Sequence, residues 1–528
     1  MAATGPFRVL VQAEEGAGAA AVDAAVAALD AADRWLVEPL FPDEPDGDLQ
    51  VIVLDPAIPL APTQMFDLAA TVAARPGIAR AEPDLPVTAY APPGAEGGGT
   101  PVGAFAAAPP APPTPDDLRW AGRGIDVEGA WALGARGQGI RIGHPDTGYT
   151  PHTLFGPGAL DLTTDRDVID DDDDARDPLR RSPVPLARFP GHGTGTGSVI
   201  VARGDGTSAL RGIAPEATLV PLRAVNSVVQ FLDSDVARAV DHARRHDCHI
   251  VSMSLGGKGF FGLRKAIDRC LDEGMIVMAA AGNHVRLITA PASYESCIAV
   301  AATGRDDTPW SGSSRGADIE VSAPGSGVFG AAWTLDGTPT EHTSTKAGTS
   351  YAVVHVAGVA ALWLSHHGRD ALLARYPGRM LSQAFRRIVA RHGHRRPDGW
   401  DTSRWGVGIV DARATLAAPL PDPATLDGVG AFAAAPAPGA GPAPRTGAER
   451  IAAAFGELDA AAVTARLASA GIASEEVTDR VAAEVLYHLM TDDGAAAGFA
   501  ADTGAGAFAP TWPQRLRDRG SATLNDAL

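Results

Sequence analysis

The sequence predicts an α/β protein: a parallel sheet with helices on both faces, preceded by a small α+β domain and followed by a helical tail. Strand-like and helix-like segments alternate through the middle of the chain, which is typical of a parallel sheet covered on both sides. Two stretches rich in Ala, Pro and Gly flank this region, and such compositions form spacers rather than packed cores. We therefore expect a small domain at 1–90, a linker at 91–114, the main domain at 115–418, a second linker at 419–447 and the tail at 448–528.

Composition and charge exclude several classes of protein. With 45% hydrophobic and 20% charged residues, the 528-residue chain has the composition of a folded globular protein. The net charge of −19 repels phosphate backbones, so we expect no nucleic-acid partner. The longest apolar stretches are short or interrupted, so we expect no membrane span. Without a recognisable signal peptide, and with three cysteines that cannot form a disulfide framework, we expect a cytoplasmic protein with free thiols. These cysteines are Cys248, Cys270 and Cys297.

The first segment carries its own order of elements. The helices are marked by apolar side chains that recur on one face, and the strands by short apolar runs between turn residues. Strands are expected at 7–12, 34–41 and 49–54 and after the Pro76-Gly77 stop, and helices at 19–33 and 63–75. The resulting order β-α-β-β-α-β is that of the ferredoxin-like fold.

The main domain contains apolar runs that predict buried strands. They are the segments GIRIGHPD, ATLVPLRA, CHIVSMSL, MIVMAAAG and SCIAVAATG. Helical runs lie between them, such as 234–246 and 261–273. In the tail, apolar stripes at helical spacing predict one helix at 451–467 and a second from Ser474 to Leu489.

Three short segments of the main domain carry residues able to do chemistry. Asp146-Thr-Gly follows a buried strand, His192-Gly-Thr opens a helical run, and Gly348-Thr-Ser350 opens a buried helix. Strand ends and helix starts can meet at the carboxyl edge of a parallel sheet, so these side chains can converge. A serine hydroxyl is a weak nucleophile that needs a base, and a buried carboxylate can orient a histidine for that task.

The same edge offers donors for a developing oxyanion. A serine at a helix N-terminus has backbone N–H groups beside its oxygen. Asn283, in the segment AAAGN just past a buried strand, can add an amide donor. Taken singly, Asp-Thr-Gly is usually a turn and Gly-Thr-Ser a helix cap, but their combination with Asn283 favours a catalytic site.

With these motifs the chain resembles the subtilisin-like serine proteases (subtilases, peptidase family S8). RIGHPDTG, GHGTGTGS and GTSYAVVHVAG are similar to the aspartate, histidine and serine motifs of that family. The order Asp, His, Ser is that of subtilisin and not of chymotrypsin or the α/β-hydrolases. The resemblance covers about 115–418 and includes further segments in the family's order. These are GIAPEATLVPLRA, IVSMSLGG, AAAGN, PASYESCIAVAAT, SAPG and WGVGIVDA.

The resemblance implies a role for each of these residues. Ser350 would be the nucleophile, His192 the general acid and base, and Asp146 the orienting carboxylate. Asn283 and the backbone N–H of Ser350 would form the oxyanion hole. Two positions depart from the family pattern: Val354 stands where proline usually precedes His355, and Gly195 where the histidine motif usually has a second histidine. Neither change removes a reacting group.

The resemblance also implies how a peptide substrate would bind. The segment Ser254, Leu255 and Gly256 resembles the edge strand that pairs with the substrate backbone by strand addition. Ala280 to Gly282 would line the first side-chain pocket, which receives the residue before the cleaved bond.

The same resemblance suggests a role for residues 1–90. Subtilases often carry a ferredoxin-like propeptide that assists folding and inhibits the enzyme, and PGIARAEPDLPVTAY resembles the end of one. We therefore expect the N-terminal domain to act as an intramolecular inhibitor. A release cut would fall within Tyr90–Thr114.

Cofactors are not required by this chemistry, and we predict no metal at the catalytic site. The run Asp170–Asp174 offers the hard oxygen donors that Ca²⁺ prefers. Ligands normally alternate with turn residues, however, so a solvated acidic loop is the favoured interpretation and calcium the alternative.

Together these expectations describe a serine endopeptidase that works through an acyl-enzyme, with its N-terminal domain as inhibitor and a peptide or protein as substrate. The alternative from another class is a catalytically silent protein that holds a peptide in the same cleft. A third hypothesis is a protease dedicated to one partner.

Overall fold

The computed structural model describes the folded parts of the chain. The described residues are 7–29, 35–54, 60–85, 114–181, 189–204, 210–229, 231–257, 259, 261–284, 288–426, 460–469, 484–485, 487–489, 499 and 512–527. The expected linkers lie outside these residues apart from Thr114 and 419–426, and so do most of the expected release region and much of the two expected tail helices.

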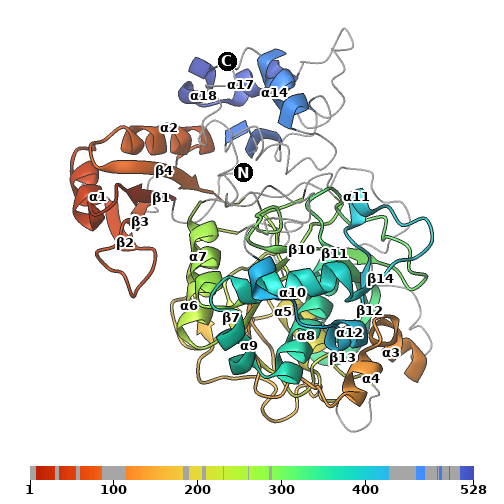
Figure 1. Ribbon diagram of the computed structural model, residues 1–528. Helices are drawn as coiled ribbons and strands as arrows, with labels where there is room; N and C mark the ends of the chain where they lie inside the picture. The colour runs from red at the N-terminus through yellow and green to blue at the C-terminus, as the bar shows by residue number, and fades with distance from the viewer. Residues whose placement is uncertain are drawn as a thin grey trace.

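The N-terminal domain is a small α+β unit with an antiparallel sheet, as the sequence predicts. Its strands are β1 (Arg8–Ala13), β2 (Trp35–Pro39), β3 (Leu49–Leu54) and β4 (Ile78–Asp84), and its helices are α1 (Gly18–Ala27) and α2 (Pro62–Ala73). The strand order is β2-β3-β1-β4. In Figure 1 this domain stands beside α7 and α6 of the main domain.

Strand β1 buries both of its faces, because successive side chains of a strand point to opposite sides. Val9 and Val11 pack with Phe66 in the core under the two helices of the domain. Leu10, between them, joins the core of the main domain. One strand therefore takes part in two hydrophobic cores.

The main domain is built on a large, mostly parallel sheet. Its strands are β5 (Arg141–Asp146), β6 (Arg166–Asp167), β7 (Thr218–Arg223), β8 (Ile250–Met253), β9 (Ile276–Ala280), β10 (Ile298–Thr303), β11 (Val321–Pro324), β14 (His394–Arg395) and β15 (Ile409–Val410). Among the described residues the order is β14-β15-β11-β10-β9-β8-β5-β7-β6. The neighbouring pairs are parallel except β14 with β15 at one edge. The expected fold class is confirmed.

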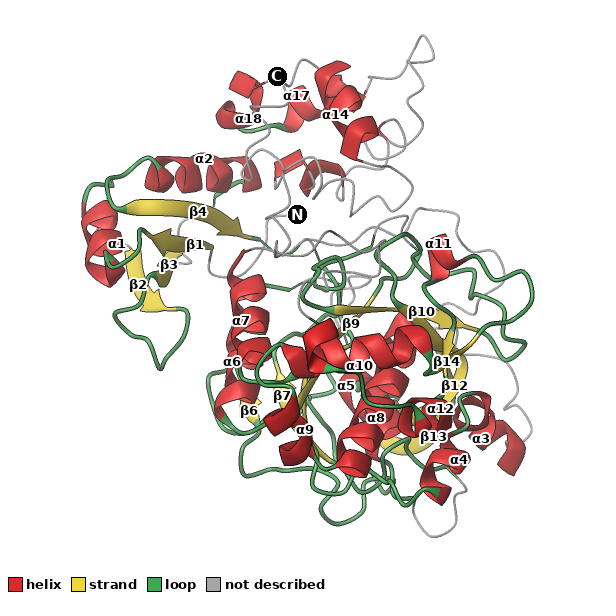
Figure 2. Ribbon diagram, in the orientation of Figure 1, coloured by secondary structure: helices red, strands yellow, loops and turns green. Residues whose placement is uncertain are grey.

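Helices cover both faces of this sheet (Figure 2). They are α3 (Pro115–Gly124), α4 (Val127–Ala132), α5 (His192–Val201), α6 (Asp233–Arg245), α7 (Phe261–Asp272), α8 (Thr349–His367), α9 (Arg369–Arg375), α10 (Met380–Arg391), α11 (Thr402–Trp405) and α12 (Ala412–Ala417). Helices α5, α8 and α10 pack in one core and α6 and α7 in the other. A hairpin of β12 (Ser326–Thr334) and β13 (Thr340–Ala347) precedes α8.

Helix α8 runs through the core and carries the serine motif at its start. Its side chains are buried from Thr349 to Leu364, so it is apolar around its whole circumference rather than on one face. Val354, in place of the usual proline, is fully buried within this continuous helix.

The described part of the tail is helical. It includes α14 (Ala460–Ser469), α17 (Trp512–Arg519) and α18 (Ala522–Ala527). The tail lies against α2 of the N-terminal domain, where the rings of Phe66 and Tyr487 meet edge to face with centroids 5.5 Å apart. No helix within the described ranges combines the length and apolarity that a bilayer span requires.

Candidate active site

The aspartate of the first motif is the last residue of β5 and has no exposed surface. Its Oδ1 accepts the Thr147 backbone N–H at 2.7 Å and the Nδ1–H of His192 at 2.8 Å. Burial raises the pKa of Asp146, but His192, His144 and the Thr147 N–H together lower it by more, so the net pKa lies below its ordinary value. The carboxylate is therefore ionised at neutral pH.

The histidine of the second motif opens α5, and two glycines permit its approach to Asp146. Gly191 caps the helix with φ at 73°, a left-handed conformation that favours glycine. A Cβ on Gly193 would lie 2.3 Å from the carbonyl oxygen of Gly148 and 3.1 Å from the Cβ of Asp146. Without a side chain there, the first turn of α5 can pack directly against the end of β5.

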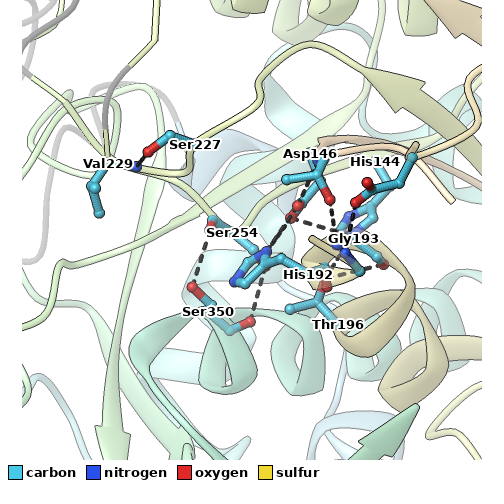
Figure 3. A network of polar contacts seen from close by, with 12 residues as sticks. His144, Asp146, His192, Gly193, Thr196, Ser227, Val229, Ser254 and Ser350 are labelled. Carbon is cyan, nitrogen blue, oxygen red and sulfur yellow. Dashed lines mark hydrogen bonds and ion pairs between the residues drawn. The ribbon is translucent and has the colours of Figure 1, made fainter. Parts of the chain in front are cut away.

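Ser350 is the second residue of α8 and is nearly buried. Its hydroxyl donates to the Ser254 carbonyl at 3.0 Å, and the Ser254 hydroxyl donates to the Ser350 carbonyl at 2.9 Å. Figure 3 shows this reciprocal pair beside His192. Within the described residues, Asp146 and His192 are hydrogen-bonded, whereas no hydrogen bond joins the Ser350 hydroxyl to His192. The Ser350 hydroxyl is therefore directed at Ser254 and not at His192.

Asn283 follows β9 and its side-chain amide has a defined orientation. Its Oδ1 accepts the Thr349 backbone N–H at 2.8 Å and the Thr349 hydroxyl at 2.9 Å. Because an oxygen is required to accept both, the other end of the amide is the Nδ2 donor group, which lies 3.3 Å from where a Cβ on Gly348 would be. A donor thus lies beside the N-terminus of α8, where Ser350 has its own backbone N–H.

The expected substrate-pairing segment follows β8. Ser254 and Leu255 are buried, and the Gly256 N–H donates to the Val228 carbonyl at 3.0 Å. A substrate strand that pairs with the Gly256 N–H must therefore displace Val228. Sequence reasoning did not anticipate this internal bond.

The expected first pocket is bounded by the same segment and the end of β9. Ala280 is buried, and the Gly282 N–H donates to the Thr349 hydroxyl at 3.1 Å. The side chain of Thr289 lies between the two segments: its Oγ1 is 2.1 Å from where a Cβ on Gly256 would be, and its Cγ2 is 3.2 Å from the corresponding point on Gly282. Thr289 carried no signal in the sequence, because only the folded loop brings it here.

The acidic loop at 170–174 lies beside Arg223 of β7, and four of its five carboxylates have arginine partners. Arg166 pairs with Asp171 and with Asp173, the latter at 2.8 Å. Asp170 is 2.6 Å from Arg223, and Asp174 is 2.9 Å from Arg176. Among the described residues, His, Cys, Asp and Glu side chains form no group of three that could hold a metal ion.

Comparisons with known proteins agree with this architecture. A sequence model described as the subtilase family, Peptidase_S8, matches residues 137–391. Thermitase from Thermoactinomyces vulgaris is 31% identical over 249 residues, covering 47% of this chain and 82% of thermitase. Subtilisin DY from Bacillus licheniformis is 32% identical over 230 residues, covering 42% of this chain and 77% of that protein.

The chain belongs to the subtilase family. It is a subtilisin-like serine protease, a hydrolase, as its motifs indicated. A protease from Pseudoalteromonas arctica has 26% identity and a TM-score of 0.50, covering 57% of this chain and 97% of that one. Fervidolysin from Fervidobacterium pennivorans, a keratinolytic enzyme related to subtilisin, has 21% identity and a TM-score of 0.55, covering 79% of this chain and 62% of that one. The likeness to fervidolysin supports the fold alone.

A second polar residue of this site, His144, was not predicted from the sequence. His144 is almost fully buried, two residues before Asp146 on β5, and its Nε2 is 3.7 Å from the Asp146 Oδ2. The alternation of side chains along a strand places both on one face, so the sequence did contain a signal for it.

Proposed function

We propose that this subtilase is an endopeptidase that cleaves peptide bonds through Asp146, His192 and Ser350. The observation that carries the proposal is the 2.8 Å bond between the His192 Nδ1–H and the buried Asp146 carboxylate. This bond leaves Nε2 of His192 as the base. Ser350 lies at the start of a helix beside an amide donor, so nucleophile, base and oxyanion donors converge on one point.

In the reaction, the Ser350 hydroxyl turns from the Ser254 carbonyl and transfers its proton to Nε2 of His192. Its oxygen bonds to the substrate carbonyl carbon, and the charge on the carbonyl oxygen is stabilised by the Asn283 amide and the Ser350 backbone N–H. Asp146 stabilises the imidazolium. His192 then gives its proton to the leaving amine as the C–N bond breaks, and water releases the acyl group by the same steps.

The test of this chemistry is covalent labelling of Ser350 by a fluorophosphonate. The purified chain should take up one probe per molecule once residues 1–114 have been removed, and Ser350→Ala should take up none. Absence of labelling in the parent would reject the proposal and leave a subtilase fold that only holds peptides. Digestion of denatured casein by the same sample then separates a general protease from one dedicated to a single partner.

We further propose that the N-terminal domain restrains the enzyme by docking on α6 and α7. Several ion pairs cross this interface: Arg8 with Asp235 at 2.5 Å, Glu38 with Arg238 at 2.8 Å, and Asp43 with Arg244 at 2.5 Å and Arg269 at 2.8 Å.

Apolar contacts support the same docking. Leu40 and Phe41 share the core that holds the buried face of α7, and the Arg269 guanidinium lies over the Phe41 ring at 4.3 Å from its centroid. An interface with a buried apolar centre and a charged rim is typical of stable association.

The intact mass of the chain after hours at neutral pH tests self-processing. The parent should lose its first 90 to 114 residues or so while Ser350→Ala stays whole. Co-elution of the released domain with the remainder on gel filtration is expected if it acts as an inhibitor. Separation of the two parts without any change in activity would contradict that role.

A further inference from the structure

His144 sits behind the catalytic carboxylate with both ring nitrogens engaged (Figure 3). Its Nδ1 is 3.1 Å from the Ser252 carbonyl oxygen, and its Nε2 is 2.9 Å from the Thr196 hydroxyl. With the Asp146–His192 bond on the other side, one carboxylate lies between two imidazoles. A histidine is an unusual choice for the interior of a sheet unless its polar atoms are satisfied.

The acceptors around this ring fix where its protons lie. A carbonyl oxygen only accepts, so Nδ1 of His144 carries a proton. The Thr196 hydroxyl has one proton, and it also lies 3.0 Å from the His192 carbonyl oxygen and 3.2 Å from that of Gly193. In the neutral ring, Thr196 donates to Nε2. In the charged ring, Nε2–H donates to Thr196, whose hydroxyl then donates to the His192 carbonyl.

The same ring connects three segments of the site: β5 with Asp146, α5 with His192, and β8, which leads to Ser254. Ser252 lies on β8, two residues before the Ser254 that bonds to the nucleophile. Thr196 lies on α5, one turn after His192. His144 itself shares β5 with Asp146. A single buried side chain thus links all three through polar contacts.

We propose that His144 is a positioning residue: a second imidazole behind Asp146, kept neutral by the Thr196 hydroxyl, that holds the three segments in register. This role rests on the proposed function of Asp146, His192 and Ser350. Were His144 to take up a proton, a second cation would face Asp146, and the carboxylate would stabilise the His192 imidazolium less in the transition state.

The charges around His144 favour the neutral ring. Burial lowers its pKa most strongly, Asp146 on its own strand raises it, and His192 on α5 lowers it, with the net pKa below its ordinary value. The residue opposite on β7 is Pro221, and β8 contributes the Ser252 carbonyl, neither of which titrates. Hydrogen bonds to the Ser252 and Gly193 backbone also raise this pKa, so Asp146 is the charged group that draws a proton to the ring. Thr196 supplies the competing hydrogen bond.

Replacing Thr196 by valine tests the proposal, because it keeps the shape and removes the hydroxyl. Nε2 of His144 then has no donor, and the polar groups left near the ring, the Asp146 carboxylate at 3.7 Å and the Gly193 backbone, both raise the pKa of His144. In Thr196→Val we expect the acid limb of the pH profile of kcat/KM to move to higher pH by half a unit or more. The value of kcat should fall, with little change in KM. In the double variant His144→Gln/Thr196→Val, which has nothing to titrate at this position, the limb should return to the parent midpoint.

A spectroscopic measurement of the protonation of His144 tests the proposal independently of catalysis. In ¹⁵N-histidine-labelled full chain carrying Ser350→Ala, the ring signals that vanish on adding His144→Gln belong to His144. We expect a neutral ring protonated at Nδ1 at pH 7, and partial conversion to imidazolium near that pH when Thr196→Val is added. A charged His144 at pH 7 in the parent, an unmoved acid limb in Thr196→Val, or a shift that persists in the double variant would each overturn the proposal. Failure of fluorophosphonate labelling, by contrast, would reject the proposed function and not the protonation of His144.

Discussion

The carboxylate of Asp84, at the end of β4, accepts the backbone N–H of Asp233, the first residue of α6, at 2.8 Å. Its other oxygen accepts the Ser234 N–H at 3.2 Å. The N-terminal domain thus caps a helix of the main domain that has no side-chain cap of its own. A carboxylate at a helix N-terminus is favoured by both the free N–H groups and the helix dipole.

This interface predicts a pH dependence for docking. Burial raises the pKa of Asp84 and of Asp235, and Arg8, which faces both, lowers them only in part. A raised pKa in the docked state means that docking takes up protons. Association should therefore weaken as pH rises from about 4, the ordinary carboxyl pKa, through the raised values. Each unit by which docking raises a pKa changes the association constant about tenfold across this pH range.

The measurement uses Ser350→Ala chain with a foreign protease site inserted within 91–113 and cut after folding. The fraction of the N-terminal domain that co-elutes with the main domain is then compared at pH 5 and pH 8. Asp84→Asn keeps the shape and one acceptor, so its profile should be flatter. Tighter docking at pH 8 than at pH 5 in the parent would show that the buried carboxyls do not control the association.

The contribution of the oxyanion donor can be predicted from the orientation of Asn283. Asn283→Ala removes the amide that we propose as an oxyanion donor, so kcat should fall about 10²–10³-fold with little change in KM, a magnitude that was measured on a subtilisin. Thr349→Val removes one of the two anchors of the amide oxygen. It should cause a smaller loss of kcat. Equal losses of kcat and of substrate affinity in Asn283→Ala would place Asn283 in substrate binding instead.

Much of this architecture could be predicted from the sequence because it depends on local patterns. Asp146 and His192 are marked by apolar strands, glycines and helix starts that lie within ten residues of them. The direction of the Ser350 hydroxyl and of the Asn283 amide could not be predicted, because each is set by a partner at least 66 residues away. The position of Thr289 likewise depends on backbone hydrogen bonds that join it to Ala281 and its neighbour Ala290 to Gly257.

Thr289 predicts a preference for small residues before the cleaved bond, because its side chain occupies space between Gly256 and Gly282. Thr289→Gly should raise kcat/KM for peptides with Phe at that position, relative to Ala, by tenfold or more. Thr289→Ser, which loses only the methyl group, should lie between the two. An unchanged preference across a peptide series, in variants with the parent melting temperature, would show that the first pocket lies elsewhere.

Removal of divalent metal should leave the protein unchanged, because the carboxylates of Asp170, Asp171, Asp173 and Asp174 are paired with arginines. Dialysis against EDTA is expected to alter neither the melting temperature nor the rate of peptide hydrolysis. Added Ca²⁺ should likewise have no effect. A lower melting temperature in EDTA that Ca²⁺ restores would reveal a bound ion, because a ligand of the native state stabilises it.

Gly195 packs against the hydroxyl of Tyr351, the residue after Ser350. A Cβ on Gly195 would lie 3.1 Å from the Tyr351 hydroxyl and 3.2 Å from the Ala331 carbonyl oxygen. The Tyr351 ring in turn meets the His192 ring edge to face, with centroids 6.2 Å apart. Gly195→His, which restores the usual family residue, should therefore destabilise the fold by about 1–3 kcal/mol through overpacking and lower kcat by displacing Tyr351.

The smaller change Gly195→Ala separates packing from helix propensity. Alanine is favoured over glycine inside a helix by about 1 kcal/mol, so in an open site Gly195→Ala would raise the melting temperature. Against Tyr351 we expect this gain to be lost, and Tyr351→Phe, which removes the hydroxyl, should recover part of it. A double-mutant cycle on melting temperature and kcat measures the coupling. A coupling of zero would mean that the space beside His192 is set by the Ala331 carbonyl and not by Tyr351.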